Sequence, residues 1–266
     1  MNQSTTLDET SVGRLAALLH DAETNAREVT KITDALPDLT QEDAYAIQHE
    51  ILRIRLANGE RLSGRKMGLT SFAKMKQMGV ERPIYGFLTD RSCLVDGAEL
   101  PMRDLIHPKV EAEISVITSH ELRGPGCTAT EALAAIDMVY ASIEVIDSRY
   151  RDFRFDLVSV IADNTSAARY VIGAKGAPAA LLDLRNLGVV LERNGEVLAT
   201  GAGAAVLGHP AASLAALVNM LAAENQSLPA GTLVMTGGVT EAFRVDAGDT
   251  VHVTVQGVGT AELKLV

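Results

Sequence analysis

The chain has 266 residues, of which 47% are hydrophobic, and its formal net charge at pH 7 is −10. This length and apolar content suffice for one large domain with a buried core, so disorder is not the default. The acidic charge, without a basic run, argues against nucleic acid as a partner. Cys93 and Cys127 match no metal or redox motif and receive no role. Because no N-terminal stretch reads as a signal peptide or membrane span, we expect a cytoplasmic protein with no membrane partner.

The first 60 residues carry a helical pattern. Apolar residues recur at helical spacing over 15–19 and again over 44–54. Thr40 is typical of a helix N-cap because two acidic residues follow it closely, and Asn58-Gly59 is typical of a helix end. We therefore expect a helical N-terminal part that spans residues 1–64.

From residue 65 onward the sequence favours short strands, with β-branched runs between glycines. The segments 188–193 and 196–200 flank Asn194-Gly195, a dipeptide that strongly indicates a tight β-hairpin. Residues 210–224 predict a helix with proline in its first turn.

Further strands are expected near the C-terminus, at 233–236, 250–255 and 261–266, with glycine-containing turns between them. This order suits a mixed or antiparallel sheet better than regular βαβ units. The expected fold class is therefore α+β, with a β-rich domain over residues 65–266.

Two glutamates stand two positions apart in an alternating segment, 109–115. A strand there would place Glu111 and Glu113 side by side on one face. Taken alone, the segment is better explained as a half-exposed strand with a solvated polar face.

Glu144 favours a metal site over a solvated strand face, because it lies in a run, 139–146, that is otherwise suited to burial. A buried carboxylate needs a metal ion or a cation beside it, or it becomes protonated. An ion pair with Arg149 or Lys66 is the alternative explanation. Three carboxylates without a paired histidine or cysteine motif would form an oxygen site suited to Mg²⁺ or Mn²⁺ and poorly suited to zinc.

Lys66 stands between Gly64 and Gly68, and glycines permit a ligand to approach the backbone closely. We expect this lysine to act on the substrate and not to hold the fold, with a solvated lysine as the alternative. Small hydrogen-bonding residues also gather at 163–166 and 235–238, where they suit the binding of a carboxylate. Ordinary turn chemistry explains the same two clusters.

Taken together, these segments resemble the fumarylacetoacetate hydrolase superfamily, in particular its branch of hydratases and decarboxylases from meta-cleavage degradation of aromatic compounds. The motifs that carry the resemblance are GRKMGLTS at 64–71, HPKVEAEI at 107–114, IEVIDSRY at 143–150, ADNTSAARY at 162–170, GAGAAVLGHP at 201–210 and MTGGVT at 235–240.

The resemblance implies a mixed β-roll core, with a helical N-terminal part and the catalytic site in the β-rich domain. It implies that Glu111, Glu113 and Glu144 bind the metal ion and that Lys66 is a catalytic residue. Ser166 and Thr236 are implied as substrate contacts.

The implied reaction is decarboxylation of 2-oxo-3-hexenedioate to 2-hydroxypenta-2,4-dienoate and CO₂, and the segment 73–88 is similar to the decarboxylases. Hydration of 2-hydroxypenta-2,4-dienoate is the first alternative. A non-catalytic partner subunit of a hydratase is the second, and the intact set of carboxylates argues against it. The resemblance also implies an oligomer and a complex with such a hydratase.

Overall fold

The computed structural model describes residues 7–266, except for the side chains of Lys74, Gln77 and Met78. Its helices are α1 (Glu9–Thr24), α2 (Ile32–Ala35), α3 (Gln41–Ala57), α4 (Phe72–Met78), α5 (Ala129–Ala134), α6 (Leu157–Ala162) and α7 (Pro210–Ala223). Short 3₁₀ turns also occur, among them η3 (Arg151–Phe153) and η4 (Asn164–Ser166).

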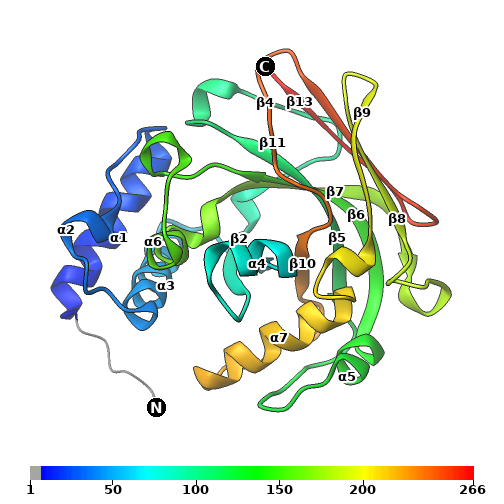
Figure 1. The fold of residues 1–266 in the computed structure, drawn as a ribbon, viewed down its shortest axis with the longest axis horizontal. Coiled ribbons are helices and arrows are strands. Elements are labelled where there is room, and N and C mark those ends of the chain that lie inside the picture. The colour runs from blue at the N-terminus through cyan, green and yellow to red at the C-terminus, as the bar shows by residue number, and fades with distance from the viewer. Residues whose placement is uncertain (1–6) are drawn as a thin grey trace.

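The strands form two curled sheets (Figure 1). The eight-stranded sheet contains β1 (Leu62–Gly68), β2 (Ile84–Thr89), β3 (Cys93–Leu94), β5 (Lys109–Thr118), β6 (Ile136–Ile146), β7 (Ala167–Pro178), β10 (Leu233–Gly238) and β11 (Phe243–Arg244). The five-stranded sheet contains β4 (Ala98–Leu100), β8 (Gly188–Arg193), β9 (Glu196–Ala202), β12 (Thr250–Val255) and β13 (Gly259–Leu265).

Strand order in the larger sheet is β2-β1-β10-β5-β6-β7-β3, with β11 also paired to β5. Both parallel and antiparallel pairs occur, since β1 pairs parallel with β10 whereas β5 pairs antiparallel with β6. The N-terminal helices α1 and α3 lie to one side of the curled sheets (Figure 1). The predicted α+β class, with a mixed β-roll core and N-terminal helices, is confirmed.

Local sequence signals account for several element ends. The hydroxyl of Thr40 accepts from the Asp43 N–H, and the Asp43 carboxylate accepts from the Thr40 N–H, which completes a capping box at α3. The β8–β9 hairpin turns at Asn194 and Gly195, whose φ angles are 56° and 80°. Both values are positive, as a two-residue turn of type I′ requires.

The predicted division at residue 64 remains a prediction. Buried residues of α1 and α3, such as Leu19 and Ile47, share one hydrophobic cluster with Phe87 of β2, Tyr150 and Ile161 of α6. The helical part therefore shares a core with elements of the β-rich part.

One stretch, 203–223, is long and apolar enough to span a membrane by length and composition alone. Half of its most apolar window is buried inside the protein. It includes α7, whose side chains Leu214, Leu217 and Leu221 belong to the main hydrophobic core. Core helices of water-soluble proteins have the same properties, so this stretch is weak support for a membrane span.

A buried ion pair fixes the segment that follows β6. The Arg149 guanidinium, 2% exposed, pairs with the Asp163 carboxylate at the end of α6. Arg149 Nη1 also donates to the carbonyl oxygens of Asp147 and Ala167, at 2.8 and 3.0 Å. Arg149 therefore connects the end of β6 to η4 and to the start of β7.

Replacement of this arginine tests the connection. We expect Arg149→Met to lower the free energy of unfolding by about 3–5 kcal/mol, because Asp163 would remain buried without its cation. Urea denaturation measures the change. The matched control is Arg61→Met, which removes an exposed pair with Asp90 and should cost less than about 1 kcal/mol. Equal losses in the two variants would contradict this role of Arg149.

Candidate metal centre

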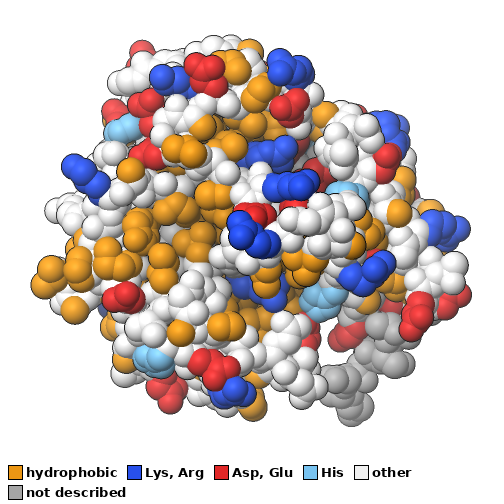
Figure 2. Space-filling model, turned by 180° about the vertical axis from the view of Figure 1, so that it is seen from behind, with side chains coloured by type: hydrophobic (Ala, Val, Ile, Leu, Met, Phe, Trp, Pro, Cys, Tyr) orange, Lys and Arg blue, Asp and Glu red, His pale blue; other side chains and the backbone are white. Residues whose placement is uncertain are grey.

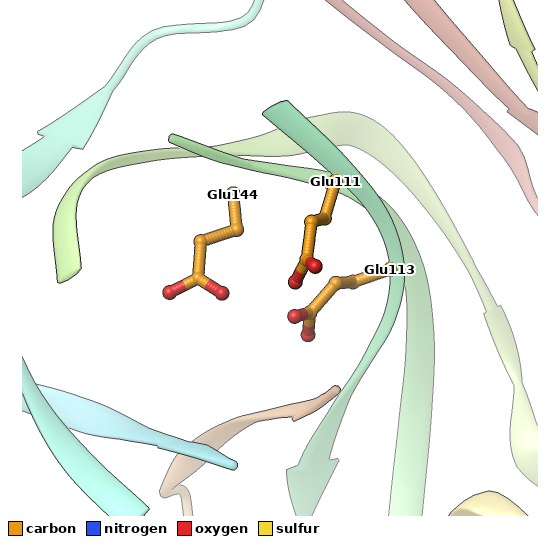
Figure 3. Close-up of side chains that lie close together, drawn as sticks. All are labelled: Glu111, Glu113 and Glu144. Atoms are coloured by element: carbon orange, nitrogen blue, oxygen red, sulfur yellow. The ribbon is translucent and has the colours of Figure 1, made fainter. Parts of the chain in front are cut away.

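Three carboxylates converge on the inner face of the larger sheet. Glu111 and Glu113 extend from β5, and Glu144 extends from the neighbouring strand β6 (Figure 3). The antiparallel register places Glu144 directly opposite Glu111. One oxygen from each carboxylate lies within 4.8 Å of the others.

The three glutamates are buried, with exposures of 9% for Glu111, 0% for Glu113 and 1% for Glu144. The interpretation of segment 109–115 as a solvated polar face is therefore wrong. β5 is covered on both faces, because Val110 and Ala112 point into the main hydrophobic core on the opposite side. Periodicity alone could not distinguish a solvated polar face from a buried one.

Burial makes these charges costly. Desolvation, followed by the charge of Glu144, raises the pKa of Glu113 well above its usual range. Desolvation also raises the pKa of Glu144, although the nearby Lys66 ammonium opposes that shift. Glu113 Oε1 and Glu144 Oε2 have no hydrogen-bond partner in the described part of the chain. Buried carboxylate oxygens of this kind fit a hard divalent cation.

Lys66 lies in β1 and is 2% exposed. Its Nζ is 2.8 Å from Glu144 Oε1 and 3.2 Å from the carbonyl oxygen of Thr165. The alternative of a solvated lysine is thus wrong, and the ion pair between Lys66 and Glu144 is present. Arg149, the other cation considered for Glu144, pairs with Asp163 instead.

The glycines beside Lys66 serve packing within the protein. A Cβ at Gly64 would lie 2.5 Å from the carbonyl oxygen of Leu233, and one at Gly68 would lie 3.1 Å from Ile84. Their role in a close approach of the backbone to a ligand is therefore not supported, and the argument for Lys66 rests on its position beside Glu144.

Ser166 ends a strained tripeptide next to Lys66. Asn164, Thr165 and Ser166 have φ angles of 47°, 55° and 60°, in the left-handed region that residues other than glycine rarely adopt. The Asn164 side chain holds this conformation, since its Oδ1 accepts from the Phe87 N–H at 2.9 Å and its Nδ2 donates to the Phe87 carbonyl at 3.1 Å. Ser166 is 2% exposed and its hydroxyl has no described partner.

Thr236 lies in β10 and is fully buried. Its hydroxyl donates to the carbonyl oxygen of Ile114 at 2.7 Å, across the sheet. For this hydroxyl to donate to a substrate oxygen, that hydrogen bond would have to break. The predicted role of Thr236 stays a prediction.

Two neighbouring glycines act on the carboxylates, and the sequence interpretation missed them. The Gly237 N–H donates to Glu113 Oε2 at 2.9 Å. A Cβ at Gly238 would lie 2.8 Å from Glu111 Oε2, so a larger residue would displace that carboxylate. We expected the cluster 235–238 to bind a substrate carboxylate through hydroxyls and backbone amides, whereas its Gly237 amide contacts a glutamate of the protein and Gly238 leaves room for another.

A large cavity of about 1050 Å³ lies elsewhere, between α3, α7 and the start of β2. Tyr85 donates to Glu224 there at 2.6 Å, and His49 lies 3.3 Å from the same carboxylate. None of the three converging glutamates lines this cavity. Its polar cluster is thus separate from the candidate metal centre.

Known proteins resemble the chain over its whole length. It is 51% identical to a 4-oxalocrotonate decarboxylase of Pseudomonas putida, over 98% of this chain and 99% of that protein. A 2-hydroxyhexa-2,4-dienoate hydratase of Comamonas testosteroni is 36% identical, over 92% and 94% of the two chains.

A solved structure is similar in both sequence and fold. It is the 4-oxalocrotonate decarboxylase from Pseudomonas putida G7 complexed with magnesium and adipate, with a TM-score of 0.97 and 50% identity, over 99% of this chain and all of that one. The profile of the fumarylacetoacetate (FAA) hydrolase C-terminal family matches residues 62–266. The chain therefore belongs to the fumarylacetoacetate hydrolase family.

Proposed function

We propose that this protein is a metal-dependent decarboxylase that converts 2-oxo-3-hexenedioate to 2-hydroxypenta-2,4-dienoate and CO₂. The observation that carries the proposal is the convergence of three buried carboxylates, of which Glu113 and Glu144 each have an oxygen without a hydrogen-bond partner in the described part of the chain. The choice of decarboxylation rests on similarity, because identity to a decarboxylase is 51%, whereas identity to two hydratases is 36% and 39%. A related structure complexed with adipate, a six-carbon dicarboxylate, supports a small dicarboxylate substrate.

In this proposal Glu111, Glu113 and Glu144 hold Mg²⁺ or Mn²⁺. A related decarboxylase structure contains magnesium, which supports that choice. When bound, the ion supplies positive charge that stabilises the negative charge developing on the 2-oxo oxygen. The Gly237 N–H orients the Glu113 carboxylate, and the absence of a side chain at Gly238 leaves room for Glu111.

The substrate is a vinylogous β-keto acid. As the bond between C5 and C6 breaks, CO₂ leaves and the electron pair moves through the conjugated system to the 2-oxo oxygen. That oxygen then takes up a proton, which gives the dienol.

In the proposed site Lys66 binds a substrate carboxylate or assists the proton movement. Its Nζ is held at the end of β1 by Glu144 and by the carbonyl of Thr165. The Ser166 hydroxyl, which is buried without a described partner, is proposed as a substrate contact, and Thr236 as a second.

Hydration of 2-hydroxypenta-2,4-dienoate remains the competing function, because the hydratase relatives also match most of the chain. The segment that favoured decarboxylation, 73–88, includes Lys74, Gln77 and Met78, whose side chains lie outside the described part of the structure. The choice of decarboxylation over hydration therefore rests on similarity across the whole chain.

We further propose an oligomeric, cytoplasmic enzyme of aromatic meta-cleavage catabolism that associates with a hydratase. Hydrophobic side chains gather on one side of the rear face of the molecule, while charged ones are scattered (Figure 2). Large exposed apolar areas are typical of protein interfaces. The pathway is inferred from the similarity to known decarboxylases and hydratases of this family.

Replacement of Glu144 tests the metal centre. We expect Glu144→Gln to weaken Mg²⁺ or Mn²⁺ binding by at least about tenfold, because even indirect partners of a metal are worth about 10- to 100-fold in affinity. Isothermal titration calorimetry measures the affinity, and a thermal melt checks that the variant folds. Glu196→Gln, on the exposed end of the β8–β9 hairpin, is the control. Unchanged affinity in folded Glu144→Gln would show that the metal site is wrong.

Replacement of Lys66 should change how the stability of the protein depends on pH. Without metal, Lys66→Met should lose more stability relative to the parent as pH rises above the usual range of glutamate pKa values. The raised pKa of Glu144 keeps it protonated in acid, and ionisation at higher pH leaves a buried charge without its cation. Denaturation at several pH values measures this difference, with Lys175→Met as an exposed control.

With metal, folded Lys66→Met should lose most of its turnover. Normal turnover per folded molecule, combined with a large loss of stability, would leave Lys66 a purely structural role.

A product assay separates decarboxylase from hydratase. The purified protein with Mg²⁺ or Mn²⁺ should release CO₂ from 2-oxo-3-hexenedioate and accumulate the dienol, with little 4-hydroxy-2-oxopentanoate. The reason is that hydration needs a positioned water at the distal end, whereas decarboxylation needs room there for a second carboxylate. Conversion of added dienol to equimolar 4-hydroxy-2-oxopentanoate, without CO₂ from the diacid, would make the protein a hydratase.

A further inference from the structure

Lys109 is the first residue of β5 and faces the same side of the sheet as the carboxylates. The register with β6 is continuous from Lys109, opposite Ile146, to Glu111, opposite Glu144. Side chains two residues apart in a strand share a face, whereas Val110 points into the core behind it. Alternate residues are about 7 Å apart along a strand, so Lys109 stands one such step before Glu111.

An aromatic ring holds the ammonium of Lys109 in place. Lys109 Nζ lies 4.0 Å from the centroid of the Phe153 ring, close enough for a cation–π contact. Phe153 and its neighbour Asp152 have φ angles of 58° and 57°. Two consecutive non-glycine residues in the left-handed region indicate a backbone that the surrounding structure constrains, and such strain gathers at ligand sites.

Lys109 has no ion-pair partner in the described part of the chain. No ion pair joins it to a carboxylate among residues 7–266 whose side chains are described. Its partner in β11 is Arg244, directly opposite, and like charges in that position repel. Arg244 is itself 3.6 Å from Asp246, and the residue opposite Lys109 in β6 is the apolar Ile146. Lys109 is therefore a cation at the end of the carboxylate row that no carboxylate of the described chain pairs with.

We infer that Lys109 binds the second carboxylate of a dicarboxylic 2-oxo acid and so makes the site prefer diacids to monoacids. The inference rests on the proposed function, in which the glutamates hold the ion that takes the 1-carboxylate and 2-oxo group. A six-carbon chain is similar in length to the strand step of about 7 Å from Glu111 to Lys109. The ammonium attracts the distal carboxylate of the diacid but not the neutral CO₂ formed from it. Lys109 therefore favours binding of the substrate without retaining CO₂.

Two unreactive acids of equal length test the inference. 2-Oxoadipate carries a distal carboxylate, 2-oxohexanoate lacks it, and neither has the double bond that decarboxylation requires. Isothermal titration calorimetry of the Mg²⁺-loaded protein should give tighter binding of 2-oxoadipate. Lys109→Met, which keeps an unbranched stem against Phe153, should weaken 2-oxoadipate binding about tenfold and change 2-oxohexanoate binding less than about twofold.

Two further variants complete the test. Lys109→Arg retains the charge and should recover most of the preference for 2-oxoadipate. Lys264→Met removes an equal charge from β13 in the other sheet and should leave both affinities unchanged. Equal losses for the two acids in Lys109→Met, or no loss for either, would overturn the inference.

The two proposals fail in different ways. Absence of CO₂ release from 2-oxo-3-hexenedioate by the parent protein would count against the proposed reaction alone, because the saturated acids report on Lys109 without turnover. Equal affinity of the parent protein for 2-oxoadipate and 2-oxohexanoate would count against the role of Lys109 alone.

Discussion

Burial of three carboxylates on one face of a curled sheet is the constraint on which the rest of the site depends. Glu113 and Glu144 are almost inaccessible to solvent, and the ionised carboxylate is the form that desolvation disfavours most. The chain compensates in part, through the Lys66 ammonium and the Gly237 N–H. Two carboxylate oxygens stay without partners, so the fold keeps a local deficit of positive charge that a divalent cation would remove.

That arrangement requires a rigid frame, and the β5–β6 pair supplies it. Their antiparallel register runs from Lys109 to Thr118 with one irregularity, at the end remote from the glutamates. Because a shift of one residue would turn every side chain to the other face, the apolar residues that alternate with the glutamates also fix where the carboxylates point. The hydrophobic core and the candidate site are therefore set by the same register.

The charged side chains near the site differ in how completely they are paired, and this difference has consequences. Arg149 and Asp163 pair completely and connect β6 to η4, where Thr165 accepts a hydrogen bond from Lys66. Glu113 and Glu144 each keep a carboxylate oxygen without a hydrogen-bond partner in the described part of the chain, and Lys109 forms no ion pair there. A fully paired buried charge holds a conformation, whereas an incompletely paired one attracts a ligand. In this fold the Arg149–Asp163 pair holds the segment whose Thr165 carbonyl oxygen accepts from Lys66, and Lys66 in turn pairs with Glu144.

By itself the sequence was enough to place the N-terminal helices, the N-cap at Thr40, the β8–β9 hairpin and the face shared by Glu111 and Glu113, because each depends on spacing or turn chemistry within one segment. Tertiary structure decided what lies beside each segment. The burial of β5, the partner of Arg149 and the packing of Gly64 against Leu233 depend on strands distant in sequence. Periodicity assigns a side chain to a face, and only the fold determines whether that face meets water, a cation or another carboxylate.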